Sequence, residues 1–235
     1  MSRVALIVSH GQPSDPGPAE AELAELTRSV AALLPGWAVR SATLAKPGAL
    51  ALAVQGGPGV VFPMFMAGGW FVQDHLPKRM VEAGGDGWRY LPPFGLDAAV
   101  QALCVGMARE AAAEIGLVPR ACAVLLAAHG SFRSPAPSQV ANAMVARIKA
   151  AGFARAEAYF IDQAPRIASA RGFGPASLCL PFFAAKGGHV VEDLPKALAE
   201  AGFAGRVLMP LSLDPRVPGL IAKAILEQNS TPPTS

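Results

Sequence analysis

Two histidines, His129 and His189, occupy positions from which they could bind a metal ion and exchange protons. His129 follows the apolar run 123–128, and His189 follows the apolar run 180–183 and the pair Gly187-Gly188. Imidazole is the side chain that both binds divalent metals and transfers protons near neutral pH. A neutral imidazole suits borderline divalent ions and can also accept a proton. We therefore interpret His129 and His189 as the candidate catalytic and metal-binding residues.

The same arrangement occurs earlier in the chain. The apolar run 4–9 ends in His10-Gly11, and His129-Gly130 lies 119 residues later. Two further landmarks repeat in the same order with offsets of 117 to 119 residues: Pro63 and Gly68-Gly69 with Pro181 and Gly187-Gly188, and 93–97 with 210–214. Ordered matches at nearly one offset indicate an internal duplication. We expect two similar halves, 1–117 and 118–235, joined near Gly116–Arg120.

The first half departs from the pattern at its second landmark. Counted from Gly68-Gly69, Trp70 stands where the duplication would place a second histidine, and His75 follows five residues later. Trp70 could form a wall on which a flat ring stacks, or it could belong to the core. The second half is therefore predicted to carry the active site. We interpret His10 as a substrate-binding residue. The sequence leaves open whether His10 or His75 contributes to a second site.

Short apolar runs alternate with segments of helical periodicity along the whole chain. The predicted strands and helices are strands 4–9, 37–44, 59–66, 88–91, 121–128, 155–161, 177–183 and 206–209, and helices 20–34, 73–83, 97–115, 139–151, 191–201 and 219–227. This alternation predicts an α/β fold with parallel sheets. In such sheets, ligands bind beyond the carboxyl ends of the strands. The His-Gly and Gly-Gly landmarks all follow strand ends.

These motifs resemble the CbiX family of sirohydrochlorin metal chelatases, which are class II tetrapyrrole chelatases. The resemblance rests on His129-Gly130-Ser131, on 180–189 with its Gly-Gly-His, on 191–195, and on the opening motif 10–16. It spans roughly residues 3 to 225. It implies two flavodoxin-like halves facing across a cleft and the insertion of Fe²⁺ or Co²⁺ into the anionic macrocycle sirohydrochlorin. The products would be siroheme or cobalt-sirohydrochlorin for cobalamin, with the metal as substrate and no permanently bound cofactor.

The family's two active-site histidines correspond to His129 and His189. A non-catalytic tetrapyrrole or metal carrier on the same scaffold is the alternative function. The carboxylates of the macrocycle need cationic or hydrogen-bonding partners, and Ser131, Arg133 and Lys186 lie beside the landmarks. The bare backbone of Gly187 and Gly188 could lie against the ring. Each of these residues would otherwise be an ordinary surface residue.

A carboxylate also follows a predicted strand in the second half. Asp162 comes directly after the strand 155–161, and Glu157 lies within it. A carboxylate at a strand end could orient a histidine or guide a cation. It could equally be a loop acid without a role in chemistry.

Composition excludes several other classes of protein. The net charge is only +3, without a Lys/Arg run, which argues against a nucleic-acid partner. The chain has no GxSxG elbow and no GxGxxG after its first strand. The three cysteines form no CxxC pair and are expected in the core. With no membrane span and no signal-peptide pattern at the start, we expect a cytoplasmic protein. Because both halves lie in one chain, we expect a monomer.

Overall fold

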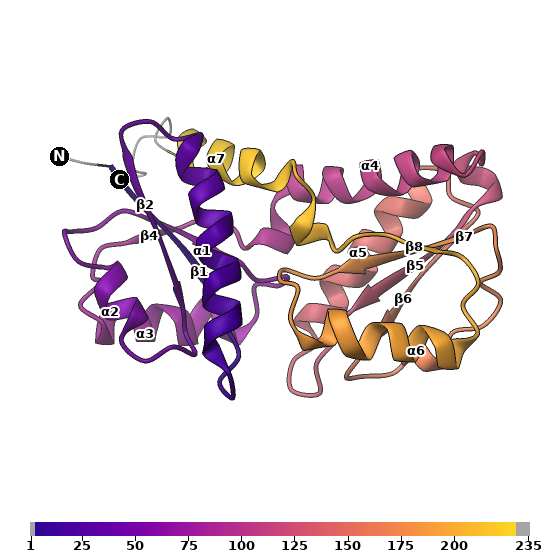
Figure 1. Cartoon of the computed structure of the whole chain (residues 1–235), viewed down its shortest axis with the longest axis horizontal. Helices are drawn as coiled ribbons and strands as arrows, with labels where there is room; N and C mark the ends of the chain where they lie inside the picture. Colours follow the sequence, from indigo (N-terminus) through magenta and orange to yellow (C-terminus); the bar gives the residue numbers. More distant parts are fainter. Residues whose placement is uncertain (1–2, 229–235) are drawn as a thin grey trace. The chain divides into compact units, whose positions relative to one another are not determined.

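The computed structural model describes residues 3–228, which contain two four-stranded sheets of the same topology (Figure 1). The strand orders are β2-β1-β3-β4 and β6-β5-β7-β8, and every pair is parallel. The strands are β1 Arg3–Ser9, β2 Trp37–Thr43, β3 Val60–Pro63, β4 Arg89–Tyr90, β5 Ala123–Ala128, β6 Arg155–Phe160, β7 Ser177–Phe182 and β8 Arg206–Val207. The predicted α/β fold with parallel sheets is confirmed.

Helices connect the strands in a similar order in the two repeats. They are α1 Pro16–Ala32, α2 Ala49–Ala53, α3 Leu76–Glu82, α4 Ala98–Glu114, α5 Ala136–Ala150, α6 Leu194–Ala201 and α7 Val217–Glu227. The exception is that α2 of the first repeat is replaced in the second by a single 3-10 turn, Ile167–Ser169, between β6 and β7. One π-helical turn precedes α3 and another precedes α6: η1 Phe71–His75 and η5 His189–Asp193. None of the helices within residues 3–228 has the length and apolar character needed to cross a lipid bilayer.

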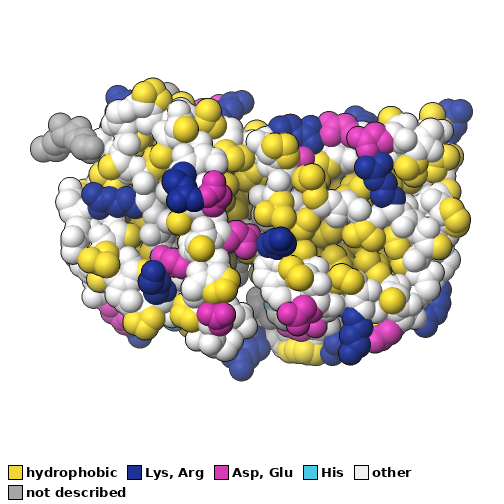
Figure 2. Space-filling model, in the orientation of Figure 1, with side chains coloured by type: hydrophobic (Ala, Val, Ile, Leu, Met, Phe, Trp, Pro, Cys, Tyr) yellow, Lys and Arg dark blue, Asp and Glu magenta, His cyan; other side chains and the backbone are white. Residues whose placement is uncertain are grey.

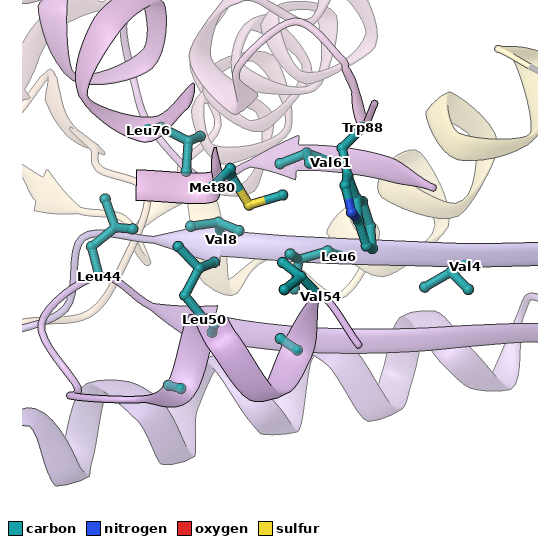
Figure 3. Packing of buried hydrophobic residues seen from close by; sticks show 13 residues of the cluster. Val4, Leu6, Val8, Leu44, Leu50, Val54, Val61, Leu76, Met80 and Trp88 are labelled. Atoms are coloured by element: carbon teal, nitrogen blue, oxygen red, sulfur yellow. The ribbon is translucent and has the colours of Figure 1, made fainter. Parts of the chain in front are cut away.

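The central strand of each sheet is buried because helices cover it on both faces. In the first sheet, Leu6 and Val8 of β1 pack with Val61 of β3 against Leu76 and Met80 of α3, as Figure 3 shows. A separate cluster surrounds β5 and β7 of the second sheet. This burial explains why the strands read as continuous apolar runs rather than as alternating patterns.

The chain forms two compact units, and each of them contains the last helix of the other repeat. Among the described residues, the first unit consists of 3–94 and 215–228, and the second of 95–214. Helix α4 ends the first repeat but packs on β7 and α5 of the second unit, whereas α7 ends the second repeat and packs on α1 and β3 of the first (Figure 1). The two repeats have therefore exchanged their last helices.

The backbone of β1 approaches β3 so closely that Gly59 has no room for a side chain. A Cβ atom there would lie 2.2 Å from the carbonyl oxygen of Val4. We expect Gly59→Ala to lower the free energy of unfolding by about 1–3 kcal/mol, as overpacking typically does. Gly219, in α7, has no atom within 4 Å of the same position. The control Gly219→Ala should be neutral or stabilising by up to about 1 kcal/mol. Urea denaturation checks both, and equal stability of the two variants would contradict the close approach.

Candidate active site

Three loops begin side by side at the carboxyl edge of the second sheet. β5 pairs with β6 on one side and β7 on the other, so that Ala128 lies opposite both Phe160 and Phe182. The residues that follow are His129 after β5, Asp162 shortly after β6 and the Gly187-Gly188 loop after β7. The parallel register therefore gathers the chemically capable side chains of this unit at one edge.

The ring of His129 has a defined orientation. Its Nδ1 atom lies 3.0 Å from the carbonyl oxygen of Gly130 and 3.3 Å from Oδ2 of Asp162. A carbonyl oxygen and a carboxylate oxygen can only accept, so Nδ1 is the donor in the neutral ring. The lone pair then lies on Nε2. Because nearly half of the His129 side chain is exposed, this geometry suits an imidazole that binds a metal ion or accepts a proton.

The loop after β6 holds the His-Gly-Ser segment in place. The backbone N–H of Asp162 donates to the carbonyl oxygen of His129 at 2.9 Å, and the N–H of Ser131 donates to Oε1 of Gln163 at 2.7 Å. Gly130 has a φ of 75°, and a Cβ atom there would lie 2.6 Å from Cγ of Gln163. Glycine is therefore required at position 130 by both the backbone conformation and the space.

Of the predicted substrate-binding residues, Ser131 has a structural role. Its Oγ accepts the backbone N–H groups of Arg133 and Ser134 at 3.1 and 3.2 Å, which closes the turn. The side chains of Arg133 and Lys186 are exposed. Both can therefore be approached by an anionic ligand, and their role as carboxylate partners stays a prediction.

The Gly187-Gly188 loop presents bare backbone to its surroundings. Both glycines are exposed, and no atom lies within 4 Å of the place a Cβ would occupy. The carbonyl oxygen of Gly187 accepts from the N–H groups of Val190 and Val191, which starts the π-helical turn. The backbone of His189 begins that turn, but its side chain lies outside the described part of the structure. The pairing of His189 with His129 therefore stays a prediction.

Backbone hydrogen bonds show which residues of the first unit correspond to this edge. Leu44 and Ala45 donate to the carbonyl oxygens of Ser9 and His10, just as Ile161 and Asp162 donate to those of Ala128 and His129. Ala45 therefore occupies the position of Asp162. The first unit keeps a histidine at the end of its central strand but has no carboxylate beside it at this position.

The second landmark shifts by one residue when it is aligned by the backbone. Gly69 accepts from Val72 and Gln73 as Gly187 accepts from Val190 and Val191. Phe71, rather than Trp70, therefore stands at the position of His189, which corrects the alignment counted from Gly68-Gly69. The ring of Phe71 meets that of His10 edge-on, with centroids 4.7 Å apart. Residues at these two repeat positions can thus touch in the first unit.

Trp70 is a surface residue and not part of the core. Its side chain is 58% exposed, and its ring stacks on His75 with centroids 4.9 Å apart. The ring of His75 also meets Phe71 edge-on. Of the two predicted roles, the structure excludes core packing for Trp70 and leaves an exposed aromatic wall.

Two residues that the sequence patterns did not single out lie beside the His129 loop. Phe132 is 75% exposed, and the guanidinium of Arg166 lies 5.7 Å from the centroid of its ring. Arg166 also donates to the carbonyl oxygen of Ile161 at 2.7 Å and lines a hollow of about 230 Å³ together with Lys196. An aromatic residue in a polar loop was the available signal for Phe132. Arg166 reaches the site only through the fold of the loop 161–166.

Charge is not gathered on the face of the molecule seen in Figure 2, where Lys and Arg side chains lie scattered among acidic ones.

Glu157, the other candidate carboxylate, is hydrogen-bonded within its own strand. Both of its oxygens accept from Arg155 at 2.7 Å, and Oε2 accepts from the hydroxyl of Tyr159 at 2.8 Å. Glu157 therefore stabilises the edge strand β6 instead of orienting a histidine.

The cysteines offer no reactive thiolate. Cys104, Cys122 and Cys179 are buried, and burial raises the pKa of each thiol. A protonated thiol is a poor metal ligand. This agrees with the prediction that all three belong to the core.

Comparison with known proteins identifies the family. The CbiX family model matches residues 123–228, which include the whole His129 site. A solved structure of CbiX, described as the terminal enzyme for siroheme biosynthesis in denitrifying bacteria, is 46% identical, with a TM-score of 0.88 over 96% of this chain and 99% of that one. The chain belongs to the CbiX family. It is thus a metal chelatase of the class II type.

More distant solved structures share the chelatase fold. SirB from Bacillus subtilis with Fe³⁺ is 15% identical, with a TM-score of 0.74 over 98% of both chains. A multi-domain protein of Deinococcus radiodurans with structural similarity to chelatases is 19% identical, with a TM-score of 0.70 over 96% of this chain and 55% of that one. The search of curated proteins found no match.

The Arg155–Glu157 pair in this CbiX chain makes stability depend on pH. The hydrogen bonds from Arg155 lower the pKa of the Glu157 carboxyl, more than burial raises it. A lowered pKa in the folded state stabilises the fold above the unfolded pKa of about 4.3, and the stabilisation is lost as the pH falls through the folded value. We expect Glu157→Gln to unfold at a lower temperature than the natural protein at pH 7. Thermal unfolding followed by circular dichroism should show this difference shrinking towards about pH 3. A difference independent of pH would contradict the role of the carboxylate charge.

Proposed function

We propose that this CbiX protein inserts a divalent metal, Fe²⁺ or Co²⁺, into sirohydrochlorin. The observation that carries the proposal is the likeness, over almost its whole length, to a CbiX described as a siroheme biosynthesis enzyme. The orientation of His129 supports it independently, because Nε2 is left with a lone pair at an exposed strand end.

The chemistry requires a proton acceptor and a place for the metal. Insertion exchanges the two pyrrole N–H protons of the macrocycle for one divalent ion and releases both protons. His129 Nε2 can bind the incoming ion or take up a proton, and His189 would do the same from the neighbouring loop. The first unit supports the pairing by analogy, since His10 and Phe71 touch at the equivalent positions.

The macrocycle would lie against bare backbone and be held by cations at its edge. Gly187 and Gly188 are exposed with open space beside them, which allows a flat ring to approach. The carboxylates of the substrate would pair with Arg133, Lys186 and, as an addition from the structure, Arg166. That His10 and Trp70 of the first unit bind substrate stays a prediction.

The proposed function leaves two candidate metals for the reaction, iron and cobalt. Iron is favoured because the similar solved structure is described for siroheme biosynthesis. The experiment is incubation of the protein with sirohydrochlorin and each metal, followed by absorbance, with protein far below the substrate concentration. Many turnovers per chain establish catalysis, whereas one equivalent of product or less indicates the carrier. We further propose that a single chain suffices, since both histidines belong to the second unit.

Removing either histidine should affect the rate of metal insertion and leave the folding of the protein unchanged. We expect His129→Ala and His189→Ala each to lower the rate of metal insertion by about 100-fold or more, in the range of lost general base catalysis. His10→Ala should cost less, because its neighbours Phe71 and Ala45 can neither bind metal nor accept a proton. Initial rates and circular dichroism measure activity and folding. The assignment fails if His10→Ala is the most damaging of the three.

Neutralising a cation beside the site should weaken substrate binding. We expect Arg166→Gln to raise the KM for sirohydrochlorin by about 10-fold, since a hydrogen bond to a charged group contributes about 1.5 kcal/mol or more. The kcat should change little. The exposed Arg147 of α5 offers the matched control Arg147→Gln, which should leave both constants unchanged. Similar KM values for Arg166→Gln and the natural protein would remove Arg166 from the substrate site.

A further inference from the structure

The Nδ1 atom of His129 faces two oxygen acceptors that differ in kind. The carbonyl oxygen of Gly130 belongs to the adjacent residue and would be present in any His-Gly turn. The Oδ2 atom of Asp162 comes from the loop after another strand, 33 positions along the chain, and lies 3.3 Å away. The carboxylate is thus the part of this contact that depends on the sequence rather than on the turn.

The backbone places the Asp162 side chain in reach of the ring. The N–H of Asp162 donates to the carbonyl oxygen of His129, so the two residues are tied together by main chain as well as by side chain. That main-chain bond requires no particular side chain, because Ala45 makes the same bond to His10 in the first unit. A carboxylate at position 162 is therefore not needed to form the loop.

The duplication supplies an internal comparison. At the three equivalent positions the second unit has His129, His189 and Asp162, and the first has His10, Phe71 and Ala45. The unit that lacks the second histidine also lacks the carboxylate. If Asp162 were a loop acid with no role in chemistry, there would be no reason for the second histidine and the carboxylate to occur in the same unit. A carboxylate that serves a reactive histidine explains why they do.

We propose that Asp162 is the positioning residue of His129. Its carboxylate accepts the Nδ1–H hydrogen bond, fixes the rotation of the ring and keeps the lone pair on Nε2. A histidine that binds a metal commonly donates its other ring N–H to a carboxylate or carbonyl, which fixes the tautomer and makes the ligand more basic. The inference rests on the proposed function for its effect on turnover, but the hydrogen bond itself can be tested without substrate.

The kinetic test uses Asp162→Ala and Asp162→Asn. We expect Asp162→Ala to lower kcat by about 10- to 100-fold with the KM for sirohydrochlorin within twofold of the natural value. Asp162→Asn should recover most of kcat. Its amide oxygen can still accept the hydrogen bond from Nδ1 and so hold the ring in the same rotation. Glu157→Gln is the control, because Glu157 is an acid of the preceding strand β6 that is bound to Arg155, and this variant should keep the natural kcat below its unfolding temperature. A raised KM with unchanged kcat would overturn the proposal.

A double-mutant cycle tests whether Asp162 acts through His129. In the His129→Ala background, adding Asp162→Ala should change the residual rate by less than about twofold, because coupled residues are not additive. The same loss in both backgrounds would mean that Asp162 acts on the metal or the macrocycle directly, and the proposal would fail.

The tautomer of His129 gives a readout without turnover. Long-range ¹H–¹⁵N correlation spectra of the ¹⁵N-labelled protein, assigned with the His129→Ala variant, should show the hydrogen on Nδ1 of neutral His129. The signal should shift in Asp162→Ala. A hydrogen on Nε2 in the natural protein, or spectra unchanged by Asp162→Ala, would overturn the proposal. If the protein inserts no metal at all, the proposed function fails, and the tautomer measurement still decides the role of Asp162.

Discussion

The parallel pairing of β5 with strands on both of its sides is the constraint on which the candidate site depends. Parallel strands end at the same edge, so the loops after β5, β6 and β7 start level with one another. β5 and β7 bury nearly all of their side chains in the core, so the exposed polar side chains at this edge come from the loops that follow the strands. Position, rather than any long motif, brings His129 and Asp162 together.

The two repeats show what the fold requires and what chemistry requires. Both keep the strand order, the glycine after the strand-end histidine and the π-helical turn after the Gly-Gly loop. π-helical turns cost backbone hydrogen-bond geometry and are frequent at functional sites. The first unit keeps this turn but fills the surrounding positions with Phe71 and Trp70. The first unit thus has the same backbone arrangement as the second, with Phe71 and Ala45 at the positions of His189 and Asp162.

Much of the fold could be predicted because buried parallel strands and amphipathic helices leave strong patterns. The prediction missed α2, whose five residues are too few for a periodic signal. It also aligned His189 with Trp70, because counting from the glycines cannot reveal one extra residue before Leu76. Hydrogen bonds to Gly69 and Gly187 were needed to assign Phe71 to that position. The contacts of Asp162 and Arg166 depend on loop conformation, which short-range sequence patterns do not encode.

The exchanged terminal helices bear on the order in which the chain can fold during synthesis. The second unit is made of one continuous stretch, residues 95–214, and can close as soon as that stretch has left the ribosome. The first unit, although it is translated first, must wait for α7 at 217–227 to cover α1 and β3. The unit that contains β1 can therefore be completed only after the unit that contains β5. The unit that bears His129 is thus the one that can form before α7 has been made.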